Sequence, residues 1–185
     1  MILDLDALAA ALPRGGRLLG LDLGTKTIGM AVSDPGLVVA SPIGTVKRTK
    51  LGPDLVELAR VIKDYAIAGI VLGLPLNMDG SAGPRADATR SFADVLAQRG
   101  GEMKWSPLIT LWDERLSTVA VERFMLADDM TRKRRGEVVD KMAAAYILQG
   151  ALDALAHRRR LAAEAAADLA DGEDNDEDGR DSERF

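Results

Sequence analysis

The sequence contains no cysteine and a single histidine, His157, among its 185 residues. The absence of cysteine excludes disulfide bonds and thiolate chemistry, and it is consistent with a reducing compartment. His157 lies far along the chain, so no serine–histidine pair is expected, and we interpret this residue as facing solvent. Carboxylates are therefore the first candidates for catalysis.

The sequence also lacks a long hydrophobic run. No uninterrupted apolar segment approaches the ~18 residues that a membrane-spanning helix needs. The first twelve residues have no basic start and contain Asp4 and Asp6, which is not typical of a secretory signal. Since 47% of the residues are hydrophobic, we expect a soluble, cytoplasmic globular protein with no membrane partner.

The net charge of −5 is concentrated at the C-terminus. Residues 171–185 hold eight acidic and two basic side chains, a composition that predicts a disordered, solvated tail. The rest of the chain holds 22 basic and 21 acidic side chains, with two dense basic clusters at residues 47–50 and 132–135. Each cluster is either plain solvated surface or a binding site for phosphate groups.

The order of the sequence patterns predicts an α/β protein with one mixed sheet and helices on both faces. Antiparallel strands are expected first, within residues 17–46, because turn sequences interrupt the apolar runs there. Helices and strands then alternate. The later elements are predicted as strands at about 67–72 and 108–112 and helices at about 54–62, 84–98 and 137–155.

These elements define the expected domain organisation. The folded domain is predicted at residues 17–157, after an N-terminal extension of residues 1–16. Residues 158–185 are expected to form an alanine-rich helical extension followed by the acidic tail. The polar and basic residues 128–136 predict a loop before the last helix.

Asp22 is a carboxylate placed inside an apolar strand pattern. Strand alternation puts it on the same face as Gly20 and Gly24, opposite three leucines. The following strand also has one face of small residues, namely Gly29, Ala31 and Ser33. Glycine within a strand often marks the close approach of a ligand or another backbone. The pattern predicts a space kept open for a cation or a phosphate group; the alternative is a hairpin whose polar face meets water.

Two further acidic positions could meet Asp22. Asp113 and Glu114 follow the strand at 108–112, and ligand-binding groups in α/β sheets gather at such strand ends. Asp140 stands at the head of an apolar stripe of the last helix, where small alanines allow close packing. A favourable interaction with the helix dipole, of about 0.3–1 kcal/mol, is by itself sufficient to explain Asp140.

If three carboxylates converge, their repulsion requires compensation. Two like charges about 4 Å apart repel by roughly 4 kcal/mol at an effective dielectric constant of ~20. Hard oxygen ligands without histidine or cysteine suit Mg²⁺ or Mn²⁺. A carboxylate cluster that holds two such ions is suited to cleaving phosphodiester bonds in line. Asp34 and Asp79 are possible further acids, but each lies in a turn sequence that explains it.

Four stretches resemble the YqgF/RuvX family of Holliday-junction-resolvase-like pre-16S rRNA nucleases, which have an RNase H-like fold. These stretches are residues 20–34, 71–80, 113–118 and 136–144, and they occur in family order over about residues 17–155. The resemblance implies catalytic and metal-binding roles for Asp22, Glu114 and Asp140. It also implies cytoplasmic processing of the 5′ end of precursor 16S rRNA during ribosome maturation, within pre-ribosomal particles or on free RNA.

Basic side chains are the expected contacts to the nucleic acid. Lys26 and Arg115 lie within the matching stretches and could bind phosphate, although Arg115 could equally form an ion pair with a neighbouring carboxylate. Backbone binding is also expected from the basic segment Arg132, Lys133, Arg134 and Arg135.

Three alternative functions compete with the nuclease interpretation of the sequence. A resolvase acting on four-way DNA junctions would use the same chemistry on another substrate. A non-catalytic RNA-binding or transcription factor with the same fold is opposed by the intact acids at all three positions. A sugar-kinase or actin-type ATPase would need a second domain and a second copy of the Asp22 motif, which the sequence lacks.

Overall fold

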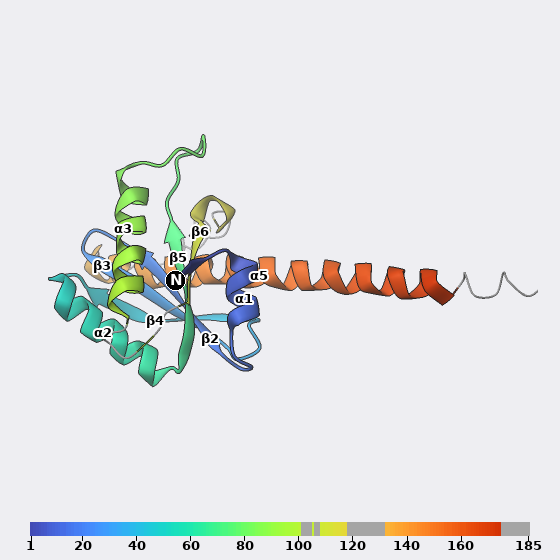
Figure 1. Cartoon of the computed structure of the whole chain (residues 1–185). Helices are drawn as coiled ribbons and strands as arrows, with labels where there is room; N and C mark the ends of the chain where they lie inside the picture. The colour runs from blue at the N-terminus through green and yellow to red at the C-terminus, as the bar shows by residue number, and fades with distance from the viewer. Residues whose placement is uncertain (101–104, 106–107, 118–131, 175–185) are drawn as a thin grey trace, which may run out of the picture.

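The computed structural model describes residues 1–100, 105, 108–117 and 132–174, and for residues 117, 132–141 and 168–174 it describes the backbone only. Six strands form one mixed sheet in the order β1-β6-β5-β2-β3-β4 (Figure 1). The α/β fold with one mixed sheet and helices on both faces, predicted from the sequence, is confirmed. Within the described part of the chain, no helix has both the length and the apolar character needed to cross a membrane.

The first half of the sheet is an antiparallel meander. β2 (Arg17–Leu23) pairs with β3 (Thr27–Ser33), which pairs with β4 (Ala40–Lys47). The three strands follow the alternation expected for residues 17–46, and the β2–β3 connection lies in the predicted turn.

The second half of the sheet is parallel. β5 (Ile67–Leu74) lies between β2 and β6 (Leu108–Asp113) and runs parallel to both. β5 is almost completely buried, as its continuous apolar run predicts. Because β2, β5 and β6 point the same way, their carboxyl ends meet at one edge of the sheet.

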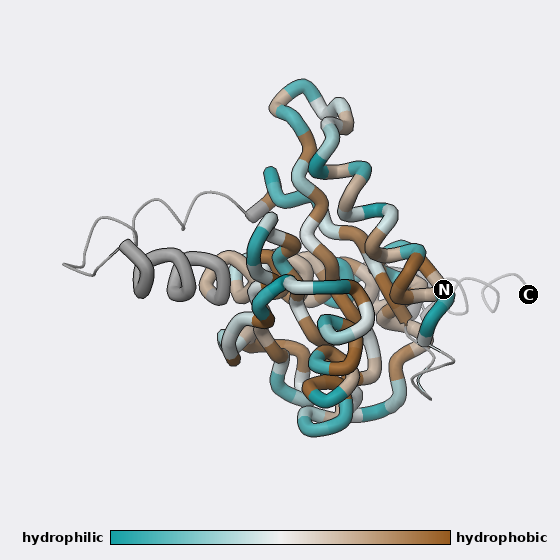
Figure 2. The backbone as a smooth tube through the Cα atoms, turned by 90° about the vertical axis from the view of Figure 1, so that its left-hand side faces the viewer, coloured by the Kyte–Doolittle hydropathy of each residue, from teal (hydrophilic) through white to brown (hydrophobic). Residues whose placement is uncertain are grey.

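Two helices cover one face of the sheet. α2 (Leu51–Asp64) and α3 (Pro84–Arg99) follow β4 and β5, close to the predicted bounds. Their apolar residues, including Leu58, Phe92 and Leu96, pack on the leucines of β2 that alternate with Asp22. These residues form the larger of the two hydrophobic cores, and the hydrophobic colouring of Figure 2 runs through the middle of the molecule.

The opposite face is covered by α1 (Leu5–Ala11) and α5 (Arg132–Asp174). α5 starts at Arg132, so the loop predicted for residues 128–136 is wrong at least from Arg132 onward, while residues 128–131 lie outside the described residues. Arginine and lysine are good helix formers, and this propensity outweighs the polar character of the segment. The C-terminal half of α5 extends away from the sheet (Figure 1), and residues 156–167 are exposed.

The residues before Gly16 are part of the folded body. β1 (Ile2–Leu3) adds a parallel strand beside β6, and the Ile109 N–H donates to the Met1 carbonyl over 3.1 Å. Leu5 and Leu8 of α1 are buried in the core beneath α5. This segment thus covers an edge of the sheet that would otherwise be open.

α5 lies against the backbone of β2 at Gly20. An ideal Cβ built on Gly20 would come within 2.6 Å of the Leu148 Cβ and 2.8 Å of the Ala144 carbonyl oxygen. These distances are shorter than real Cβ contacts allow, so only glycine permits the observed approach. The small face of β2 therefore sets how close α5 comes to the sheet.

We predict that Gly20→Ala destabilises the protein by about 1–3 kcal/mol, because α5 must shift to admit the methyl group. The matched control is Gly52→Ala, at an exposed position of α2 where a Cβ meets nothing within 4 Å. The control should be neutral or stabilising by about 0.4–1 kcal/mol. Urea denaturation measures both free energies of unfolding, and equal stabilities of Gly20→Ala and the original chain would contradict the packing described.

Candidate active site

Asp22 lies near the carboxyl end of β2 between two glycines. Gly29 of β3 is its direct partner across the antiparallel pair. On the other side, Leu21 pairs with Leu72 of β5, so Gly73 follows at the level of Asp22. Both neighbouring positions on the Asp22 face therefore carry no side chain, as the sequence pattern predicts for an open space.

The Glu114 carboxylate occupies the space above Gly73. Glu114 begins the short 3₁₀ helix η1 (Glu114–Ser117) directly after β6. A Cβ on Gly73 would lie 2.7 Å from Glu114 Oε1, so a side chain there would displace the carboxylate. Because Gly73 neighbours Asp22, the two acids are brought together at the carboxyl ends of three parallel strands. The sequence marks Gly73 as the end of an apolar run and does not reveal this role.

The environment of Glu114 disfavours its charge. Burial is the largest cause, and the nearby Asp22 carboxylate acts in the same direction, so that the pKa of Glu114 is raised to about 7. Arg85 opposes the shift, and Asp113 adds slightly to it. A cation bound between Asp22 and Glu114 would compensate the repulsion between the two negative charges.

Asp113 is engaged by a different group. The Arg115 side chain donates to both Asp113 carboxylate oxygens, from Nε over 3.0 Å and from Nη2 over 2.6 Å. These hydrogen bonds hold the pKa of Asp113 below its usual range. The ion pair considered for Arg115 is thus present, and Glu114, not Asp113, is the acid whose ionisation is coupled to Asp22.

Asp140 lies on α5 four residues before Ala144, the residue whose carbonyl faces Gly20. Its backbone is therefore one helical turn from the point where α5 meets β2. The Asp140 side chain is outside the described residues, as are the side chains of Arg132, Lys133, Arg134 and Arg135. Among the described side chains, no group of three or more potential metal ligands is present.

Arg85 is a basic residue of this site that the sequence patterns do not reveal. It occupies the second position of α3, and its charge favours the ionised form of Glu114. Lys26 is exposed in the turn that follows β2. Arg85 thus places positive charge near Glu114, and Lys26 adds an exposed positive charge in the turn after Asp22.

A family model described as "Holliday junction resolvase" matches residues 16–154 of the chain. The chain belongs to the RuvX family.

RuvX-family relatives are similar over most of the chain. A protein of Rhodospirillum centenum named "Putative pre-16S rRNA nuclease" is 62% identical over 154 residues, which is 83% of this chain and 82% of the relative. A protein of Rhodobacter capsulatus with the same name is 59% identical over 157 residues, covering 84% of this chain and 95% of the relative.

Solved structures are more distant from this RuvX-family chain. RuvC of T. thermophilus in complex with a Holliday junction substrate is 12% identical with a TM-score of 0.49, covering 75% of this chain and 94% of that chain. The yeast mitochondrial Holliday junction resolvase Ydc2 is 11% identical with a TM-score of 0.47, covering 86% and 89%.

Asp34 and Asp79 act in turns in this RuvX-family chain, as the sequence predicts. Asp34 accepts backbone hydrogen bonds from Gly36, Val38 and Val39, which lower its pKa. Asp79 accepts from the hydroxyl and the backbone N–H of Ser81, and its pKa is also lowered.

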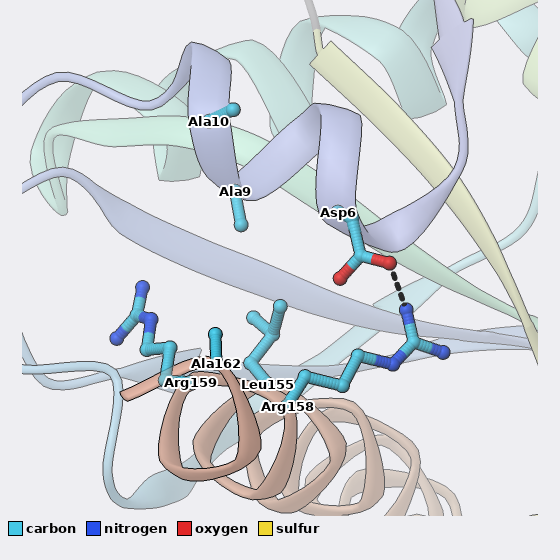
Figure 3. Close-up of a pocket in the computed structure, with 7 residues that line it drawn as sticks. All are labelled: Asp6, Ala9, Ala10, Leu155, Arg158, Arg159 and Ala162. Carbon is cyan, nitrogen blue, oxygen red and sulfur yellow. Dashed lines mark hydrogen bonds and ion pairs between the residues drawn. The ribbon is translucent and has the colours of Figure 1, made fainter. Parts of the chain in front are cut away.

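A hollow of about 500 Å³ lies between α1 and α5 (Figure 3). Its lining includes Leu155, which is eleven residues and therefore about 16 Å along the helix from Ala144. Arg158 forms an ion pair with Asp6 across it, and alanines line the rest of its walls together with Arg159. This hollow lacks the paired acids and is separate from the site of Asp22 and Glu114.

The raised pKa of Glu114 gives a pH-dependent stability. The folded state holds this proton up to about pH 7, whereas the unfolded chain releases it near the ordinary value of 4.5. The unfolded chain therefore binds fewer protons between these values, and the free energy of unfolding falls as pH rises from about 4.5 to about 7.

In the presence of a chelator, we expect the original chain to lose stability relative to Glu114→Gln across this window. Urea denaturation at about pH 5, 6, 7 and 8 measures the difference, with Asp64→Asn at the exposed C-terminal end of α2 as the control that keeps the original profile. Parallel pH profiles of the original chain and Glu114→Gln would contradict the raised pKa of Glu114.

Proposed function

We propose that this protein is a metal-dependent nuclease that hydrolyses phosphodiester bonds in precursor 16S rRNA. The observation that carries the proposal is the meeting of Asp22 and Glu114 in a glycine-lined space at the carboxyl ends of β2 and β6. Two neighbouring acids whose charges repel each other, one of them largely buried, suit a site that binds cations.

The donor set fits Mg²⁺ or Mn²⁺. Asp22 and Glu114 supply hard carboxylate oxygens, and we propose Asp140 as a third ligand from α5. When bound, the metal would stabilise charge on the phosphate and lower the pKa of a water molecule; two ions would act on both the attacking and the leaving oxygen. Gly29 places no side chain beside Asp22, and Gly73 admits the Glu114 carboxylate next to it.

Basic side chains around the acids would position the substrate. We propose that Lys26 and Arg85 contact phosphate oxygens on either side of the scissile bond. Arg115 holds Asp113 and the loop before α3, where its Nη1 donates to the Met78 carbonyl over 3.4 Å. We propose that Arg115 orients the segment that carries Glu114. If Arg115 also contacts a phosphate, it does so with the guanidinium group that binds Asp113.

The relatives' names support RNA as the substrate, since they are named for precursor 16S rRNA. We propose cleavage at the 5′ end of this precursor during ribosome maturation in the cytoplasm. The description of the family model favours a second candidate, a resolvase of four-way DNA junctions. Both candidates use the same carboxylates, so the substrate has to be separated by assay.

We predict that Asp22→Asn lowers the cleavage rate with Mg²⁺ or Mn²⁺ by more than about 100-fold, since even groups behind a metal ligand contribute 10- to 100-fold. Asp64→Asn, at the exposed C-terminal end of α2, is the matched control and should cleave normally. Single-turnover cleavage of precursor 16S rRNA is the measurement, with thermal melts to show that both variants fold. Undiminished cleavage by folded Asp22→Asn would refute the site.

The same variants decide the substrate. Precursor 16S rRNA and a four-way DNA junction are incubated separately with the original chain and with Asp22→Asn. We expect Asp22-dependent cleavage of the RNA to be faster than that of the junction. Faster Asp22-dependent cleavage of the junction would favour the resolvase, and binding of RNA with no cleavage by the original chain would favour a non-catalytic factor.

The segment Arg132–Arg135 is proposed to bind the RNA backbone because four consecutive basic residues precede Asp140 on α5. Replacing all four by alanine, which preserves helix propensity, should reduce the slope of log affinity against log salt by about 0.7 for each lost contact to single-stranded RNA. Fluorescence anisotropy at several salt concentrations measures this slope. A slope equal to that of the original chain would show that the segment does not bind phosphate.

A further inference from the structure

The second basic cluster of the sequence, residues 47–50, gathers beside the turn that follows Asp22. Lys47 pairs with Thr27 at the end of β4, and the Arg48 N–H donates to the Lys26 carbonyl over 2.8 Å. The Arg48 guanidinium also donates to the Gly24 carbonyl over 2.7 Å. Two chain segments therefore bring Lys26, Lys47, Arg48 and Lys50, all exposed, to one end of the sheet.

A pocket of about 280 Å³ opens between this turn, the β4–α2 connection and α3. Its polar lining consists of Thr25, Arg48, Thr49 and Lys50, and Phe92 contributes an aromatic side chain. The volume lies just below the range of about 300–1,000 Å³ typical of small-molecule sites. The pocket is therefore large enough for one phosphate group with part of its sugar or base.

The one acid of the pocket is already used. Asp54 is buried and accepts hydrogen bonds from the Thr49 N–H over 3.0 Å and the Thr49 hydroxyl over 3.1 Å. These bonds hold the β4–α2 connection in place. Asp54 thus shapes the loop that presents the cations, and in the described structure it forms no ion pair with them.

The lysines at this end of the sheet differ from several arginines elsewhere in their lack of acidic partners. Arg60, Arg90, Arg115 and Arg158 each form an ion pair with an acidic side chain. In the part of the chain that the structure describes, Lys26, Lys47 and Lys50 form none. Several positive side chains without acidic partners favour the binding of a polyanion.

The pocket lies within reach of the acids. Thr25 is three residues beyond Asp22, so their Cα atoms are at most about 10 Å apart. Asp22 belongs to the face of the sheet that α5 covers, whereas the pocket lies on the face of α2 and α3. A polymer that passes over the carboxyl ends of the strands would meet both.

We propose that this pocket and its lysines bind backbone phosphates of the RNA strand, on the far side of the sheet edge from the scissile bond. The inference rests on the proposed nuclease function, because that function places the scissile bond at Asp22 and Glu114. It identifies the ligand as the phosphate–sugar backbone, which Thr25, Arg48 and Lys50 recognise by charge and hydrogen bonding. The bases would take no part.

The test compares Lys47→Ala/Lys50→Ala with a matched control, Arg14→Ala/Lys63→Ala. The control removes two exposed positive charges near the amino ends of β2 and β5, at the opposite edge of the sheet. The probe is a fluorescein-labelled single-stranded RNA of about 20 nucleotides, titrated by anisotropy in a chelator so that no cleavage occurs. Arg48 is left in place because its bond to Gly24 supports the turn.

We expect the lysine variant to bind the RNA more weakly, with a salt slope reduced by about 0.7 for each lost contact, while the control keeps the original slope. A lysine variant with the original affinity and slope would overturn the inference. If the lysine variant shifts the slope but the original chain does not cleave, the nuclease proposal fails and the binding site stands.

A second arm separates the polymer from a free nucleotide. Adenosine monophosphate is titrated into the original chain and into the lysine variant by calorimetry. We expect binding far weaker than that of the RNA. Tight binding of the mononucleotide that is lost in the lysine variant, with unchanged RNA affinity, would assign the pocket to a free nucleotide and overturn the backbone assignment.

Discussion

The close approach of α5 to the sheet is the constraint on which the rest of the site depends. Gly20 allows Leu148 and the Ala144 carbonyl to lie directly on the β2 backbone, and Gly73 leaves room for Ile147 beside β5. Asp140 lies on this helix one turn before Ala144, the residue that contacts Gly20. Gly20 thus allows the helix to pack on β2, and Gly73 admits both Ile147 of the helix and the Glu114 carboxylate.

The same glycine at position 73 links packing with electrostatics. Because Gly73 has no side chain, the Glu114 carboxylate can lie over β5 next to Asp22. Burial and the neighbouring charge raise the pKa of Glu114. Without a cation, it is therefore unfavourable for both acids to be ionised. Asp113, one residue earlier, has a lowered pKa because Arg115 binds it. Adjacent acids thus take opposite roles according to their partners.

The sequence predicts local secondary structure well, and contacts between residues that are far apart in the sequence less well. Alternation with a period of two identifies β2 and β3 and places Asp22 opposite the leucines, because a strand has only two faces. The role of Gly73 and the proximity of Arg85 to Glu114 depend on how β5, β6 and α3 assemble, and no local pattern encodes this. The start of α5 is missed because polar composition suggests a loop, whereas arginine and lysine tolerate a helix. The N-terminal segment is too short to show a period, although Leu5 and Leu8 are buried.

The central proposal is that Asp22 and Glu114 form a cation site, and diffraction from crystals soaked in Mn²⁺ tests it most directly. The anomalous signal locates the ion independently of any assay of activity. An anomalous peak about 2.1 Å from oxygens of both Asp22 and Glu114 is the predicted result. Fully occupied Mn²⁺ elsewhere on the protein, with no peak between these two carboxylates, would contradict it.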